Sequence, residues 1–280
     1  MTEVTKDYSI GLPPLNKSLA TMLMQDTKAY RMLQGLQGGH AVDLERIAEI
    51  LVNFSNLIVD FPDIGEIDIN PLAISGGNVS ALDARIVMDK DYLPGGPSTY
   101  PHLVISPYPT KYITSWQMKS GTDVVLRPIR PEDEPAKYEM FFSSSPESLR
   151  TRFFYPLKEI PHEFLIYFVN VDYDRNISLI AEIQEDSKKR MIGAASLVMN
   201  ADMTSGEIAV FVHDSFQGNG LGFKFIQVLI DIAREKSLQE VRAEVLRENT
   251  RMLGIFRHFC FTTHHSTGDA IECILKLITS

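Results

Sequence analysis

The sequence predicts an α/β (α+β) fold, with a mixed, mainly antiparallel sheet flanked by helices and a smaller α+β unit before it. Three strand patterns separated by short turns, at 177–184, 191–199 and 206–213, indicate an antiparallel meander. A loop with three glycines follows and leads directly into an amphipathic helix, and further strand and helix patterns alternate after it. Proline and glycine cluster from Leu93 to Tyr112, which divides the chain in two.

This division predicts three segments: a first unit at 1–93, a semi-rigid Pro/Gly-rich linker at 94–122 and a second unit at 123–280. In the first unit, apolar spacing predicts one helix at Leu15–Leu33 and another that Asp43 caps. Two strands, Ile64–Ile69 and Val79–Ile86, are expected to pair as a hairpin around a turn at 76–78.

Composition excludes several classes of protein. With 44% hydrophobic and 22% charged residues, the 280-residue chain is typical of a globular protein. The net charge of −9 argues against a nucleic-acid partner, because binding phosphates requires a basic face. The longest apolar run, Phe164–Val169, is too short to span a membrane. The N-terminal residues lack a signal peptide, and two cysteines suggest reduced thiols, so we expect a cytoplasmic protein.

The loop after His213 carries the strongest chemical signal. A predicted strand ends there, and the string Gln217-Gly-Asn-Gly-Leu-Gly222 opens a helix at once. Glycines allow a sharp turn and a close approach of the backbone to a ligand. The unpaired N–H groups and the dipole of the helix suit a diphosphate. On spacing alone a plain glycine-rich turn is the alternative, and the glycines do not fit the dinucleotide-binding fingerprint.

With the surrounding elements, this loop resembles the GNAT acetyltransferase superfamily. The resemblance rests on three strings: Gln217-x-x-Gly220-x-Gly222, Val125-Leu-Arg-Pro-Ile-Arg-Pro-Glu-Asp133 and Asn249-x-x-Met252. It covers about Asp123–Leu277 and implies a GNAT fold that uses acetyl-CoA, or another short acyl-CoA, with no metal. The cofactor-binding residues that it implies are Val210, Phe211, Val212, Gln217, Gly218, Asn219, Gly220, Leu221, Gly222, Asn249, Met252 and Phe256.

The resemblance also implies direct transfer of the acyl group from the thioester to an amine. A lysine amine, with an ordinary pKa of about 10.4, must first lose a proton. Glu207 matches the general base, and a solvated carboxylate is the alternative. A backbone N–H around 210–212 would meet the oxyanion. Phe256 stands where many relatives have a proton-donating tyrosine. Cys260 stands where they usually have glycine, and we expect a buried structural thiol rather than a catalytic one.

The first unit holds a second group of polar residues. Alternation places Glu66, Asp68 and Asn70 on one face of a strand, where Asp83 of the next strand would join them. Such oxygens suit magnesium bound with nucleotide phosphates. The string resembles the C-terminal end of the ATP-grasp domain of NDP-forming acyl-CoA synthetases, in which Asn70 and Asp83 would match the magnesium ligands. Because this sequence holds no other ATP-grasp lobe, we expect a structural remnant without a metal.

The order of an ATP-grasp end, a linker and a GNAT domain resembles the C-terminal third of the bacterial protein lysine acetyltransferases of the Pat type. This implies acetylation of a lysine on a protein substrate, with acyl-CoA synthetases as expected partners, and a chain that is a fragment or a shortened product. Two alternatives stay open: an acyl-CoA-binding regulatory module without turnover, and a fragment of an NDP-forming acyl-CoA synthetase.

Overall fold

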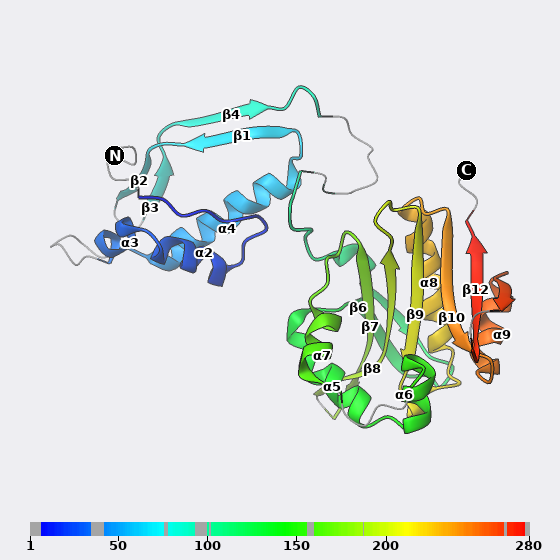
Figure 1. The fold of residues 1–280 in the computed structure, drawn as a ribbon. Coiled ribbons are helices and arrows are strands. Elements are labelled where there is room, and N and C mark those ends of the chain that lie inside the picture. Colours follow the sequence, from blue (N-terminus) through cyan, green and yellow to red (C-terminus); the bar gives the residue numbers. More distant parts are fainter. Residues whose placement is uncertain are drawn as a thin grey trace. The chain divides into compact units, whose positions relative to one another are not determined.

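The computed structural model describes residues 7–34, 42–75, 78–92, 100, 102–155, 160–186, 188–265 and 268–277. The chain divides into two compact units, Met1–Pro107 and Tyr108–Ser280 (Figure 1). The predicted turn at 76–78 and the beginning of the predicted linker lie largely outside the described residues. Within those ranges, no helix has the length and apolar character needed to cross a membrane.

The helical part of the first unit consists of α2 (Lys17–Gln25), α3 (Lys28–Leu33) and α4 (Leu44–Asp60). A small core joins α2 to α4 through Ala20, Met24, Ile47 and Ala48. The prediction of one helix at 15–33 is wrong. The chain breaks at Asp26, and the Thr27 side chain accepts the N–H of Tyr30 to cap a new helix.

The strands of the first unit form two separate pairs. β1 (Ile64–Ile69) pairs antiparallel with β4 (Ala84–Met88), and β2 (Leu72–Ser75) pairs with β3 (Asn78–Ala81). The predicted two-stranded hairpin is therefore wrong in its pairing. The short β2–β3 hairpin is inserted between the two long strands, and the N–H of Asn70 donates to the carbonyl of Asp83 across its base.

An eight-stranded sheet forms the second unit, in the order β11-β12-β10-β9-β8-β7-β6-β5. Its strands are β5 (Thr114–Gln117), β6 (Asp123–Pro128), β7 (Asn176–Glu185), β8 (Lys188–Met199), β9 (Ser205–Val212), β10 (Glu240–Leu246), β11 (Thr262–His265) and β12 (Ala270–Lys276). Neighbouring strands pair antiparallel, except for the parallel pair of β9 and β10. This confirms the predicted mixed, mainly antiparallel sheet.

The linker predicted at 94–122 extends too far toward the second unit. Its residues Thr114–Gln117 form the edge strand β5, which pairs with β6. Tyr112 is buried in the core, and Trp116 packs against that core. A strand of four residues between prolines and a tight turn gives too short a pattern to recognise from sequence.

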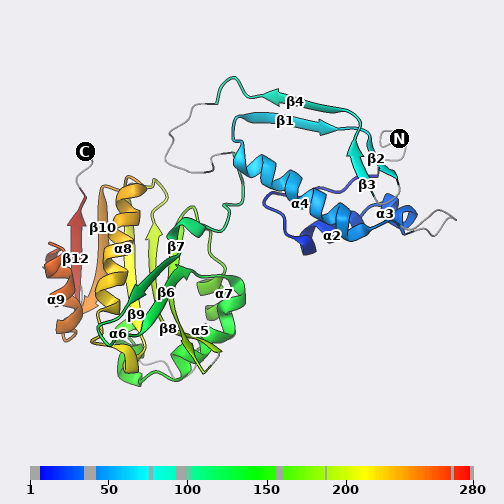
Figure 2. The ribbon, with the colours of Figure 1, turned by 180° about the vertical axis from the view of Figure 1, so that it is seen from behind.

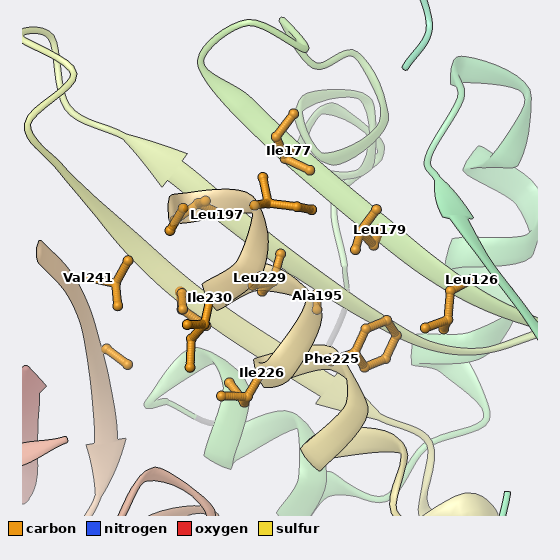
Figure 3. Close-up of a cluster of buried hydrophobic side chains, with 14 of the residues drawn as sticks. Leu126, Ile177, Leu179, Ala195, Leu197, Phe225, Ile226, Leu229, Ile230 and Val241 are labelled. Atoms are coloured by element: carbon orange, nitrogen blue, oxygen red, sulfur yellow. The ribbon is translucent and has the colours of Figure 1, made fainter. Parts of the chain in front are cut away.

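Helices cover both faces of this sheet. α5 (Glu134–Phe142), α6 (Pro146–Phe153) and α7 (His162–Val169) lie on one face (Figure 1). α8 (Leu221–Glu235) and α9 (Thr250–His258) lie on the other (Figure 2). The apolar face of α8 forms the larger core with β6–β10 (Figure 3). A second cluster, rich in phenylalanine, lies between α5–α7 and the sheet.

Candidate active site

A notch opens where the two parallel strands separate. β9 and β10 pair at three positions, the last of which joins Arg242 to Glu207. Beyond it, β9 remains paired with β8 as far as Val212, and β10 remains paired with β12 as far as Leu246. The two strands therefore diverge from Glu207 onward, and the backbone of Val210–Val212 lies along one side of the gap.

Glu207 lies at the closed end of this notch. Its side chain is exposed, whereas Gly206 and Ile208 on either side of it are buried. Burial lowers the pKa of Arg152 of α6, and the negative charge of Glu207, which lies on the same face of the strand as Phe211, partly offsets this. An accessible carboxylate therefore sits on the face of the sheet that α6 covers, next to the point where the strands part.

The glycine loop connects the open end of β9 to α8. Gly218 has φ 80° and Gly220 has φ 90°, a left-handed region that other residues rarely adopt. Gly222 differs, because it lies in the first turn of α8 and has no such φ. Gly220 is the N-cap of α8 and offers no side-chain acceptor. The first N–H groups of this helix are therefore left without a capping side chain, as an anion-binding site requires.

The two polar side chains of the loop stabilise the loop itself. Gln217 Nε2 donates to the carbonyl of Val212 at 3.1 Å and to Ser148 Oγ at 3.0 Å. Asn219 Nδ2 donates to the carbonyls of Phe216 and Gln217, each at 3.4 Å. Because both amides are engaged in this way, the backbone rather than these side chains is what the loop offers to a ligand.

A hydrogen-bonded network fastens α6 to the same loop. Asp214 accepts the N–H and the Oγ–H of Ser145, each at 2.7 Å, and the Oγ–H of Ser148 at 2.5 Å. Burial raises the pKa of Asp214, but these hydrogen bonds outweigh it and hold the pKa below its ordinary value. His213 is buried next to it, and its two ring nitrogens contact Ser143 and the N–H of Ser215. His213 is thus a packed, structural histidine.

Helix α9 lies beyond the end of β10, on the other side of the notch. Asn249 is its N-cap, and its Oδ1 accepts the N–H of Met252 at 3.1 Å. Phe256 is buried and packs against Phe261, so its ring belongs to the core. The expectation of a buried Cys260 is wrong. Cys260 is exposed and has φ 64° in the turn after α9, a conformation that favours glycine.

Three polar residues of the first unit have contacts within their own strand pair. Asn70 and Asp83 lie at the ends of β1 and β4 and are joined by a backbone hydrogen bond of 3.1 Å. Glu66 instead pairs with Arg85 at 3.4 Å. In the part of the chain that the structure covers, no group of three or more His, Cys, Asp or Glu side chains could hold a metal ion.

The two units of the chain match models of two different protein families. A model of the ATP-grasp domain matches residues 1–88, and a model of the acetyltransferase (GNAT) domain matches residues 123–262, which is half of the chain. The chain belongs to the GNAT acetyltransferase family. Its notch, Glu207 and its glycine loop all lie within the matched residues, so the candidate site is that of an N-acetyltransferase domain.

Individual relatives match one unit or the other. The first unit is similar to the acetate–CoA ligase (ADP-forming) I of Archaeoglobus fulgidus, with 34% identity over 89 residues, 32% of this chain and 13% of the ligase. The GNAT unit is similar to the acetyltransferase PA5475 of Pseudomonas aeruginosa, with 25% identity over 160 residues, 57% of this chain and 86% of that protein. This chain therefore spans a small part of the ligase and most of the acetyltransferase.

Among solved structures, the GNAT domain of S. lividans PAT has a similar fold. It superposes with a TM-score of 0.56 at 23% identity and covers 61% of this chain and 100% of that domain. At this level of identity the similarity shows the fold. The roles of individual residues have to be argued from the site of this chain itself.

Proposed function

We propose that this chain is a protein lysine N-acetyltransferase that transfers an acetyl group from acetyl-CoA to a lysine amine. One observation supports it above all others: the notch between β9 and β10 has an exposed carboxylate, Glu207, at its closed end and an uncapped helix N-terminus near its open end. A thioester with a long diphosphate-bearing arm fits such an arrangement, with the diphosphate at the helix and the acyl group close to the carboxylate.

Each part of the site has a role in this proposal. The backbone amides of Gly218–Gly222 hold the diphosphate, since the N–H of Gln217 already donates to the carbonyl of Asp214. Glu207 takes the proton of the lysine amine, directly or through a water, so that the neutral amine attacks the thioester carbonyl carbon. A backbone N–H of Val210–Val212 donates to the oxygen that becomes negative. The carbon–sulfur bond then breaks, and the thiolate leaves without help from Phe256, whose buried ring has no proton to donate.

The acceptor is proposed to be a protein because of the domain order. An ATP-grasp segment followed by a GNAT domain resembles the Pat-type enzymes, and acyl-CoA synthetases are the partners that this resemblance suggests. Both cysteines are free, which supports a reducing, cytoplasmic location.

Glu207→Gln tests the catalytic part of the proposal. We expect turnover to fall by roughly 10²-fold or more, while calorimetry shows unchanged acetyl-CoA binding, since the amide keeps the shape but cannot take a proton. Glu139→Gln, which removes an exposed carboxylate from α5, is the matched control and should retain full activity. Equal rates for wild type and Glu207→Gln would rule out the general base.

The buried Phe256 favours one second candidate, an acyl-CoA-binding module without turnover. Mass spectrometry of acyl-CoA synthetases incubated with this protein and acetyl-CoA decides between them. Acetylated lysines that depend on Glu207 support the enzyme. Micromolar acetyl-CoA binding without any acetylated lysine supports the module, and a micromolar calorimetric signal with Mg-ATP would instead point to a ligase fragment.

A further inference from the structure

Two cationic side chains lie inside the helical layer formed by α5, α6 and α7. Lys137 of α5 is 3% exposed, and its Nζ lies 5.0 Å from the ring centroid of Phe168 and 5.6 Å from that of Phe141. Arg152 of α6 lies beside the same Phe168 ring, with its Cζ 5.9 Å from the centroid and 5.4 Å from that of Phe153. Both cations are thus held against one aromatic ring in apolar surroundings.

Neither cation forms an ion pair with a carboxylate of the described residues. Among the residues that the structure describes, the side chains of Lys137 and Arg152 take part in no ion pair or hydrogen bond, and their contacts are with aromatic rings. Lys236, the other buried lysine of the described ranges, shows the usual arrangement, because its Nζ reaches the carboxylate and the carbonyl of Asp174 at 3.4 Å. Buried lysines and arginines are normally paired, since an unpaired charge is costly to remove from water.

The pKa of Lys137 reflects this cost of burial. Burial, followed by repulsion from Arg152, lowers the pKa of Lys137 to about 7, and Asp133 opposes this only in part. Asp133 itself is bound to Arg127 through two hydrogen bonds of 2.7 Å. Asp133 is therefore already engaged and offsets the cost of burying Lys137 only in part. Buried ionisable groups with strongly shifted pKa values cluster at functional sites, so this pair is a candidate site.

The pair lies next to the catalytic end of the notch. α6 packs on β9, and the negative charge of Glu207 of β9 acts on Arg152. The glycine loop opens α8, which covers the opposite face of the sheet. An anion bound by Lys137 and Arg152 would therefore belong to the molecule that approaches Glu207 from the helical layer, which is the acceptor rather than the diphosphate arm of the donor.

We infer that Lys137 and Arg152 form a subsite for a carboxylate of the acceptor, so that the preferred target is a lysine with an acidic residue close to it in sequence. This inference rests on the proposed lysine acetylation. An arginine fork donates two parallel N–H hydrogen bonds to the oxygens of a carboxylate, and the lysine adds a point charge behind it. With the ligand bound, the two cations face two carboxylates, one of the acceptor and one of Glu207, and the charges balance.

Matched peptides test this specificity. In one series, a single Glu occupies each of the three positions on either side of the target lysine, and in the other series Gln replaces that Glu. We expect wild type to favour the best Glu peptide over its Gln partner by roughly ten- to a hundredfold in kcat/KM, through a lower KM, because hydrogen bonds to charged groups have about this strength. Arg152→Gln should bring that ratio close to one, and Arg152→Lys should restore part of it.

Two further experiments identify the cause of the preference for the Glu peptide. Arg150→Gln removes a positive charge from the same helix and should leave the ratio of the two peptides unchanged. A ratio near one in wild type, or an equal loss on both peptides in Arg152→Gln, overturns the inference, and the second result would make Arg152 a positioning residue for Glu207. Faster acetylation of free glutamate than of any peptide would also overturn it, since the carboxylate would then belong to a small molecule.

Binding without turnover separates this inference from the proposed function. A peptide with norleucine in place of the target lysine cannot be acetylated, and calorimetry with the CoA-loaded full chain measures its affinity. The Glu peptide should bind more tightly than the Gln peptide and take up close to one proton at pH 8, because the bound carboxylate recharges Lys137. Such binding without any acetylation would uphold the subsite and reject the lysine acetyltransferase. Acetylation of the lysine-containing Glu and Gln peptides at equal rates would instead support the lysine acetyltransferase and reject the subsite.

Discussion

Arg150 of α6 forms an ion pair with Glu248, which lies in the turn between β10 and α9. The two residues belong to opposite sides of the notch, because α6 is fastened to the loop after β9 and the turn follows the end of β10. The pair thus connects the two sides at the open end. Both side chains are about half exposed, so the pair contributes little to the stability of the fold.

We expect the double-mutant cycle of Arg150→Gln and Glu248→Gln to give a coupling free energy of unfolding below about 1 kcal/mol. If the pair restricts the open end of the notch, each substitution should speed both the association and the dissociation of acetyl-CoA, with little change in Kd. Stopped-flow measurement with a fluorescent CoA analogue checks this. Unchanged rates in both variants would show that the pair does not limit access.

Glycine has two roles in this loop, which are to adopt a positive φ and to let a ligand approach the backbone. Substitutions of Gly220 and Gly222 separate these roles. Gly220→Ala should lower the free energy of unfolding by about 1–2 kcal/mol, because φ 90° is strained for alanine. Gly222→Ala should leave stability unchanged or raise it by up to about 1 kcal/mol, because the residue is helical and its Cβ would meet Ile255 Cδ1 at 3.6 Å, an ordinary contact. Urea unfolding measures both variants.

The same Gly222→Ala variant tests the diphosphate site. If a diphosphate approaches the backbone there, the added methyl group should weaken acetyl-CoA binding by roughly tenfold or more while the fold remains stable. Calorimetry with acetyl-CoA checks this. Wild-type affinity in a stable Gly222→Ala protein would mean that no ligand approaches this residue closely.

Sequence patterns predicted the second unit well, because its elements are long and half or fully buried. The meander β7–β9 and helix α8 were recognisable from alternation and from apolar steps of three and four. Glu207 could also be placed on a strand before the loop. The notch could not, because it depends on where two strands stop pairing, and pairing between segments distant in sequence leaves no local signal.

The missed features are all set by tertiary contacts or by turns. The pairing of β1 with β4 depends on an inserted hairpin, and β5 is too short to show a period. The exposure of Cys260 follows from a left-handed turn after α9. The network of Asp214 joins residues that are 66 to 69 positions apart in the sequence. The run Ser143-Ser-Ser-Pro146 is an N-cap pattern and indicates Ser145 as a cap, but it does not indicate the contact with Asp214.

Asp214→Asn tests how far this network holds α6 on the loop. We expect a loss of about 1–3 kcal/mol in the free energy of unfolding at neutral pH, because an amide cannot accept all three hydrogen bonds. The folded-state pKa is lowered, so this contribution is fully present above the ordinary value of 3.8 and disappears as the pH falls through the lower folded value. The difference between variant and wild type should therefore narrow below about pH 4. A difference independent of pH in acid would contradict the role of the carboxylate charge.

Lys137→Met should stabilise the protein, because it replaces a buried, unpaired cation by an apolar side chain of similar length. A pKa lowered from 10.5 to about 7 corresponds to at most roughly 5 kcal/mol. Below pH 7 the lysine is charged in both states, and the folded protein bears the full cost. From pH 7 to 10.5 the unfolded chain binds more protons, so the stability of wild type rises with pH across this window. The advantage of Lys137→Met should thus be largest below pH 7 and shrink toward pH 10, as urea unfolding of both proteins at several pH values would show. An advantage that stays constant over this range would mean that Lys137 is not charged at a cost in the folded state, and that its burial is compensated by an anion.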